Sequence, residues 1–353
     1  MALPTALPRR AVIAAPLHHL LDRGRDAGPG LLLALAVAAV ATPLGHLVPV
    51  VGGPVLAIVL GVGVGAVVRP GARLRPGLAV ASRPLLQVAI VLLGATLSLQ
   101  QVATVGLGSL PVMLGTLAVA LGGAWVLGRA LGVRGHTQVL IGVGTGICGA
   151  SAIAATTAVL RPRDHEVAYA LGTIFVFNVV AVLAFPPLGH ALGMDAQSFG
   201  LWAGTAVNDT SSVLAAAFSF GADAGPYATV VKLTRTLTLV PIVLVLAVWS
   251  ARRSGGEQGE RTALPWAKVV PWFLVAFVAA SALDTLGAVP ATWHGGITTA
   301  GTFLITTALA GIGLALRPGD LRRAGVRPLL LGAVLWVLVA ASSLGLQGLT
   351  GTL

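Results

Sequence analysis

The chain repeats one Gly-rich pattern, as GTGICGASAI at positions 144–153 and as GTAVNDTSSV at 204–213. Gly, Thr and Ser coincide in the two copies, and Gly/Ala and Ile/Val replace each other. Glycine inside an apolar run weakens a helix, whereas Ser, Thr and Asp begin one well. Each copy is therefore predicted to interrupt a helix and to start a new one, over 151–160 and over 211–220.

The composition places both copies in a membrane. Of 353 residues, 56% are hydrophobic and 9% are charged, whereas a typical soluble domain has about 25% charged residues to cover its surface. Unbroken apolar runs such as 31–40 and 240–249 suit helical spans of about 20 residues and do not alternate as barrel strands do. We expect an all-α polytopic membrane protein with about 9–11 transmembrane segments.

The net charge of +11 does not indicate a nucleic-acid partner, because nearly all Lys and Arg lie in short connections between apolar runs, where they orient a membrane protein. These connections predict a cytoplasmic N-terminal segment over 1–27, one transmembrane domain over 28–346 and a short tail over 347–353. The predicted segments are 28–49, 53–68, 77–98, 107–131, 138–160, 165–187, 196–220, 228–252, 266–285, 294–316 and 328–346.

Loop charges separate two segments from the others. If basic loops are cytoplasmic, both ends of 138–160 lie inside and both ends of 196–220 lie outside. We then expect nine full spans and two re-entrant segments that meet near the midplane; full crossings with one misassigned loop are the alternative. A second internal match pairs 94–115 with 311–332. The partners of each match would be inverted in the membrane, a pattern typical of secondary transporters.

The interrupted segments supply a candidate anion site, because the first N–H groups of a helix are unpaired and its dipole is positive there. Lys232 and Arg235 lie three residues apart, on one helical face, and would add a point charge and a planar donor fork. Asp209 and Asn178 are candidates for a coupling H⁺ or Na⁺. The predicted substrate-binding residues are Gly144, Thr145, Gly146, Cys148, Gly149, Ser151, Asn208, Thr210, Ser211, Lys232 and Arg235.

Plainer interpretations of these residues stay open. The Gly-rich stretches could be helix-packing seams, and Asp209 could form a buried salt bridge with Lys232 or Arg235. Cys148 is expected to be a small buried filler, and Asn178 could make an interhelical hydrogen bond. The sequence has no metal-ligand spacing of His, no nucleophile elbow and no phosphate loop. We therefore expect no enzyme activity, no metal and no cofactor.

Three blocks in this order resemble the YeiH-type family of proposed sulfate exporters, which are bacterial inner-membrane proteins: GTGICGASAIAA at 144–155, AGTAVNDTS at 203–211 and VKLTRTL at 231–237. The resemblance implies a fold similar to that of the cation/proton antiporter and bile-acid symporter superfamily, with inverted repeats and broken helices that cross at the midplane. In that fold the broken segments usually cross fully, unlike the hairpins that the loop charges predict. Family members often carry His at the position of Asn208, so a proton-coupling role is not transferred to this residue.

Three functions remain as hypotheses. The first is a secondary transporter of a small inorganic or organic anion, with sulfate export across the inner membrane as the leading example. The second is a cation/proton antiporter that uses Asp209, and the third is a non-transporting membrane subunit or receptor. The expected partners are a small anionic substrate and the lipid bilayer, and not nucleic acid; H⁺ or Na⁺ coupling and a homodimer are left open.

Overall fold

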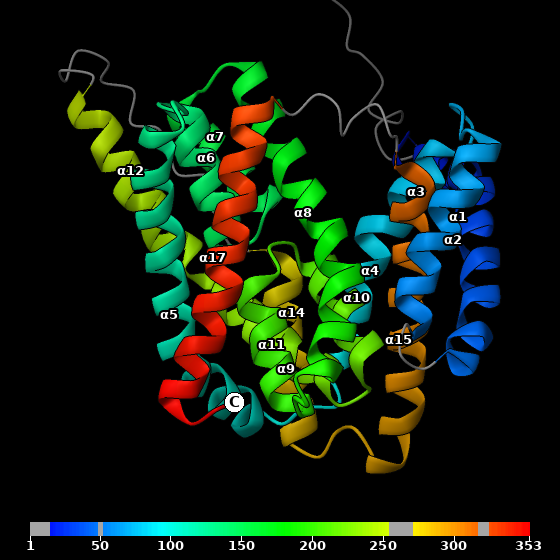
Figure 1. Ribbon diagram of the computed structural model, residues 1–353. Coiled ribbons are helices and arrows are strands. Elements are labelled where there is room, and N and C mark those ends of the chain that lie inside the picture. Colours follow the sequence, from blue (N-terminus) through cyan, green and yellow to red (C-terminus); the bar gives the residue numbers. More distant parts are fainter. Residues whose placement is uncertain (1–14, 49–51, 254–270, 317–324) are drawn as a thin grey trace, which may run out of the picture.

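The computed structural model describes residues 15–48, 52–253, 271–316 and 325–353. Every regular element in these ranges is helical (Figure 1), which confirms the all-α class. The helices of the first part are α1 (Ala15–Leu47), α2 (Gly52–Val68), α3 (Arg75–Val80), the π-helix η1 (Ala81–Leu85), α4 (Leu86–Gly94), α5 (Leu99–Ala130), α6 (His136–Gly146) and α7 (Ala150–Leu160). They are followed by α8 (Asp164–Ala191), α9 (Ala196–Ala206), α10 (Thr210–Phe220), α11 (Ala224–Leu237), α12 (Leu239–Arg253), α14 (Trp272–Thr285), α15 (Ala291–Ala315) and α17 (Val326–Thr350).

Seven helical stretches are long and apolar enough to cross a membrane, so the chain is a multi-pass membrane protein. Two further predicted spans correspond to shorter helices, α2 with 17 residues and α14 with 14 residues. The predicted segment 266–285 begins outside the described residues. The seven stretches are Ala27–Leu47, Arg75–Gly94, Leu99–Ala130, Asp164–Ala191, Ala224–Trp249, Ala291–Ala315 and Val326–Thr350.

The helices form two groups that α10 joins (Figure 1). In one group α2 packs between α1 and α15; in the other, α5 packs against α17 and α9 packs against α11. α10 contacts α8 of the second group and α2 and α15 of the first. Glycine permits the close approach of α2 to α15, because a Cβ atom at Gly61 would lie 2.7 Å from the carbonyl oxygen of Ala310. Small residues at helix contacts drive packing in membranes, where lipid removes the hydrophobic driving force.

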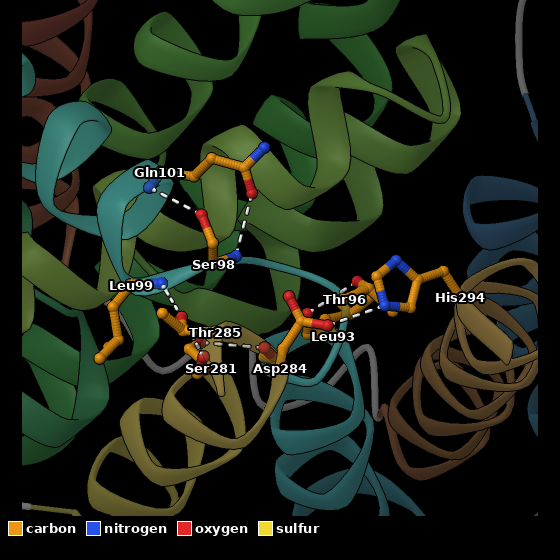
Figure 2. A network of polar contacts seen from close by, with 10 residues as sticks. Leu93, Thr96, Ser98, Leu99, Gln101, Ser281, Asp284, Thr285 and His294 are labelled. Atoms are coloured by element: carbon orange, nitrogen blue, oxygen red, sulfur yellow. Dashed lines mark hydrogen bonds and ion pairs between the residues drawn. The ribbon is translucent and has the colours of Figure 1, made fainter. Parts of the chain in front are cut away.

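The start of α5 differs from the predicted segment 107–131. Ser98 Oγ accepts a hydrogen bond from Gln101 N (3.2 Å), and Gln101 Oε1 accepts one from Ser98 N (3.0 Å). This capping box satisfies unpaired donors of the first turn, so α5 begins at Leu99 and the predicted start at 107 is wrong. Figure 2 shows the box beside α14, where Thr285 Oγ1 accepts a hydrogen bond from Leu99 N (2.8 Å).

The two Gly-rich segments are interrupted where the sequence predicts it. Segment 138–160 consists of α6 and α7, which have 11 residues each, and segment 196–220 consists of α9 and α10, also with 11 residues each. The breaks fall at 147–149 and 207–209. In both segments the repeated Gly-Thr pair ends the first helix, and the repeated Ser lies in the first turn of the second helix.

The two broken segments contact opposite ends of α8. His136 Nδ1, at the start of α6, lies 3.5 Å from Glu166 Oε2, in the first turn of α8. The rings of Phe199 in α9 and Phe220 in α10 stack with centroids 3.9 Å apart, and Phe220 also stacks on His190, near the end of α8, at 4.3 Å. The start of the first segment therefore lies beside the start of α8, and the two ends of the second segment lie beside the end of α8.

Candidate functional site

The two breaks lie against each other. Gly149 has a φ of +64°, a conformation that side chains rarely adopt, and a Cβ atom added to it would lie 3.5 Å from the Cα atom of Asp209. Gly149 and Asp209 occupy corresponding places in the repeated pattern. The chain therefore brings the same position of both copies into contact at the centre of the second helix group.

Lys232 of α11 bonds to both breaks at corresponding places. Its Nζ atom donates to the carbonyl oxygens of Ile147 and Val207, each at 2.9 Å, and Ile147 and Val207 are aligned residues of the repeat. The Lys232 side chain is fully buried. A carbonyl at the end of a helix has no intrahelical partner and carries partial negative charge, so one ammonium group satisfies the breaks of both segments.

Arg235 repeats this arrangement one helical turn further along α11. Its Nε atom donates to the Gly146 carbonyl at 2.8 Å, its Nη2 atom to the Thr145 carbonyl at 3.1 Å, and its Nη1 atom to the Thr205 carbonyl. Thr145 and Thr205 are aligned in the repeat, and Arg235 is fully buried. Both cations are therefore bonded to the C-terminal ends of α6 and α9. The sequence instead predicts that they face a solute.

The two helix starts at the breaks differ from each other. Asp209 is the N-cap of α10: its carboxylate accepts hydrogen bonds from Ser212 N at 3.3 Å and from Ser211 Oγ. Gly149, at the N-cap of α7, has no side chain to accept such a bond, and Ala150 and Ser151 are exposed. The start of α10 is thus capped by the protein's own carboxylate, while the start of α7 has no such cap at Gly149, and the Ala152 amide of its first turn bonds to the Cys148 sulfur.

Asp209 does not pair with either cation within 4.0 Å in the part of the chain that the structure describes, where the ion pairs are His136–Glu166 and His294–Asp284. The salt bridge with Lys232 or Arg235, which the sequence leaves open as a plainer interpretation, is therefore not formed among the described residues. The backbone N–H of Asp209 instead donates to Asn178 Oδ1 of α8 at 3.3 Å. Asn178 supports the unwound chain at the second break, which is one of the uses the sequence predicted.

A cavity of about 450 Å³ lies between α7, α8 and α10. Its polar lining comes from Asn178, Asp209 and Ser212, and its apolar lining includes Ala150, Ile174 and Phe175. The open start of α7 therefore faces the cavity through Ala150, opposite the capped start of α10. Sequence reasoning missed Ala150 and Ser212, although Ser212 follows the Asn-Asp pair that predicts a helix start.

None of the predicted substrate-binding residues is among the described residues that line this cavity. Cys148 is a free, buried thiol that packs in an apolar cluster with Leu117 and Leu239, as expected of a filler. Thr145 Oγ1 and Asn208 Oδ1 are buried and have no hydrogen-bond partner in the described ranges. The structure groups the rest at the two breaks: Gly144 and Gly146 at the end of α6, Ser151 at the start of α7, and Thr210 and Ser211 at the start of α10.

Comparison with known sequences identifies the family. Residues 29–332 match the family described as Conserved hypothetical protein 698. The chain is 40% identical over 326 residues to a UPF0324 membrane protein of Streptococcus pyogenes serotype M6, with 90% of this chain and 96% of the relative covered. It is 39% identical over 331 residues to one of Streptococcus agalactiae serotype V (92% and 98% covered) and 37% identical over 344 residues to one of Fusobacterium nucleatum (91% and 98% covered). The chain therefore belongs to the YeiH-type UPF0324 family of bacterial membrane proteins.

Proposed function

We propose that this protein is a secondary transporter of a small anion, with sulfate as the first candidate, and that the anion binds at the open start of α7. The observation that carries the proposal is the charge balance at the breaks. Among the described residues at the two breaks, Lys232 and Arg235 carry two positive charges and Asp209 carries one negative charge. The carbonyl ends of α6 and α9 offset part of this positive excess, and we infer that a bound anion offsets the rest.

The difference between the starts of α7 and α10 indicates where that anion would bind. At α10 the Asp209 carboxylate accepts hydrogen bonds from the first turn, and a solute anion would occupy the equivalent place at α7. Helix starts bind anions through their free N–H groups and positive dipole.

We also propose that the two broken segments are re-entrant and inverted. The first opens beside the start of α8 through His136 and Glu166, and the second opens beside its end through His190 and Phe220. α8 has 28 residues and so is about 42 Å long at 1.5 Å per residue, enough to cross a bilayer. Hairpins at its opposite ends would enter the membrane from opposite faces and meet at the breaks.

Export is the direction that the membrane potential favours for an anion. For a dianion, a potential of 100 mV, negative inside, contributes roughly 4.6 kcal/mol, twice the value for a single charge. Transport would then need neither ATP nor covalent chemistry in this chain.

The direct test is sulfate efflux from proteoliposomes under a potassium-diffusion potential. We expect efflux that increases with the potential and is absent from protein-free liposomes. Binding of sulfate without flux would instead support a receptor or a non-transporting subunit. If the protein neither binds nor transports sulfate, chloride or small carboxylates, that result would contradict anion transport.

A second function, cation/proton antiport, is favoured by one observation: the Asp209 carboxylate lines the cavity together with Asn178 and Ser212. The variant Asp209→Asn separates the two proposals, because Asn also caps a helix well but cannot bind a proton or balance a metal ion. Under antiport it abolishes pH-driven Na⁺ exchange. Under anion transport it removes a negative charge from the cavity, so potential-driven efflux continues.

A further inference from the structure

A second cavity, of about 890 Å³, lies in the other helix group, between the end of α2, the start of α3, η1 and the end of α15. It shares no lining residue with the cavity at the breaks. Arg69, from the connection after α2, Arg75 of α3 and Arg83 of η1 line it. Two parts of the chain that pack together therefore contribute three arginines to the same cavity.

The charged residues that line this cavity are basic in the part of the chain whose side chains the structure describes. There the lining has no Asp or Glu, and none of the three arginines has an acidic partner within 4.0 Å. All three arginine residues are exposed. Guanidinium groups bind phosphate oxygens through pairs of parallel donors, so the ligand that complements this cavity carries a phosphate or a similar oxyanion.

The remaining wall of the cavity is apolar and includes Leu78, Ala79, Leu314 and Leu316. Ser82 also lines it, and since its hydroxyl donates to the Leu78 carbonyl at 2.8 Å, its oxygen can accept a further hydrogen bond. A soluble anion would gain nothing from the apolar part of this wall. A ligand with a charged head and hydrocarbon chains would use both parts.

The position of the cavity fits such a ligand. Arg75 begins a candidate membrane span, and Val67 and Val68, at the end of α2 beside Arg69, expose 84% and 47% of their surface. Exposed valines next to arginines are expected where a helix leaves the hydrocarbon core for the headgroup region. The connection 69–75 is basic and therefore predicted to be cytoplasmic, on the side where anionic lipids attract clustered Lys and Arg.

We propose that Arg69, Arg75 and Arg83 form a binding site for the headgroup of an anionic phospholipid, whose acyl chains lie on the wall formed by Ala79, Ala315 and Leu316. This site is independent of the proposed transport activity, because it lies in the other helix group. Its occupant would hold α2, α3 and α15 together at the membrane surface.

The test measures retention of phosphatidylglycerol by the full chain in neutral detergent, with phosphatidylcholine as the uncharged comparison. The variant Arg69→Gln/Arg75→Gln/Arg83→Gln should weaken phosphatidylglycerol binding on the order of 100-fold, since each basic residue near the surface contributes about one factor of five. The matched control Arg129→Gln/Arg134→Gln removes two arginines from a different surface and should change it less than threefold.

A steric variant keeps the test informative if the triple variant does not fold. Ala79→Trp retains all three charges and fills the cavity, so it should displace phosphatidylglycerol while leaving the protein monodisperse. Equal retention by the wild type, the triple variant and Ala79→Trp would overturn the proposal. Equal competition by glycerol 1-phosphate, which has the charge without the chains, would also overturn it, because the occupant would then be a soluble anion.

Discussion

Ile147 and Val207, which lie sixty positions apart and occupy the same place in the repeated pattern, present their carbonyl oxygens to one ammonium group, that of Lys232, at 2.9 Å each. Arg235 joins the Thr145 and Thr205 carbonyls in the same way. Two cations of one helix thus fasten corresponding ends of α6 and α9. The unwound backbone at both breaks stays buried because side chains replace the hydrogen bonds that the helices lose.

Removing Lys232 should destabilise both breaks. Lys232→Met keeps the volume of the side chain but leaves the Ile147 and Val207 carbonyls without a donor. At about 1–3 kcal/mol for each unsatisfied group, the free energy of unfolding should fall by roughly 2–6 kcal/mol, measured by denaturation in detergent. Thr234→Val is the control, because Thr234 bonds only to its own helix, at Val230. A Lys232→Met protein as stable as the wild type would show that the ammonium group does not hold the breaks.

The packing of α2 against α15 makes a prediction with a matched pair of glycines. Gly61→Ala places a methyl group 2.7 Å from the Ala310 carbonyl oxygen, and this overpacking should cost about 1–3 kcal/mol. Gly63→Ala, two residues away, meets nothing within 4 Å and should be neutral or slightly stabilising, because Ala favours a helix. Thermal unfolding of both variants measures the difference. A similar loss at both positions would mean that helix propensity, and not contact, controls this interface.

The cap at the start of α9 should make a pH-dependent contribution to the free energy of unfolding. Hydrogen bonds from the Ser198 hydroxyl and backbone to the Asp195 carboxylate, both at 2.7 Å, hold the pKa of Asp195 below its usual range. A depressed pKa in the folded state stabilises the protein above the unfolded pKa of about 3.9 and ceases to do so as the pH falls through the folded value.

Asp195→Ala should therefore lower the free energy of unfolding by about 1 kcal/mol at pH 7, the usual value of an N-cap, and by less than this as the pH falls below about 4. Asp195→Asn keeps a capping oxygen that does not titrate, so its difference from the wild type should stay small at pH 7. Unfolding of both variants in detergent, at pH 7 and below about pH 4, measures these differences. An Ala variant whose deficit grows on acidification would contradict the assignment.

Much of the helical layout could be predicted from the sequence, because apolar runs and basic loops are strong signals in a membrane protein. The two interruptions were predictable too, since Gly-Thr followed by Ser or Asp both ends and begins a helix. The start of α5 was missed although the capping box from Ser98 to Gln101 was readable. An apolar run marks where a helix enters the membrane, and this helix begins eight residues before the predicted entry at 107.

The partners of the buried charges could not be predicted in the same way. Opposite charges in a sequence suggest a salt bridge, and Asp209 with Lys232 or Arg235 was the evident pair. Unpaired carbonyls, which no residue letter indicates, compete for the same cations at every helix end. Four broken helix ends lie at this crossing, so Lys232 and Arg235 bond to carbonyls, and Asp209 bonds to amide and hydroxyl groups of α10. That Ala150 lines the cavity depends on this arrangement of helix ends, and no sequence motif predicts it.

Sulfate flux of two variants at one position tests anion binding at the start of α7 most directly. Ala150 lines the cavity and is exposed, and Ala150→Asp would place a carboxylate in the first turn of α7, at the cavity where the anion is proposed to bind. We predict that Ala150→Asp reduces potential-driven sulfate efflux from proteoliposomes at least tenfold, while Ala150→Asn, of the same size and without charge, retains most of it. Equal efflux by the two variants, or faster efflux by Ala150→Asp, would contradict an anion site at the start of α7.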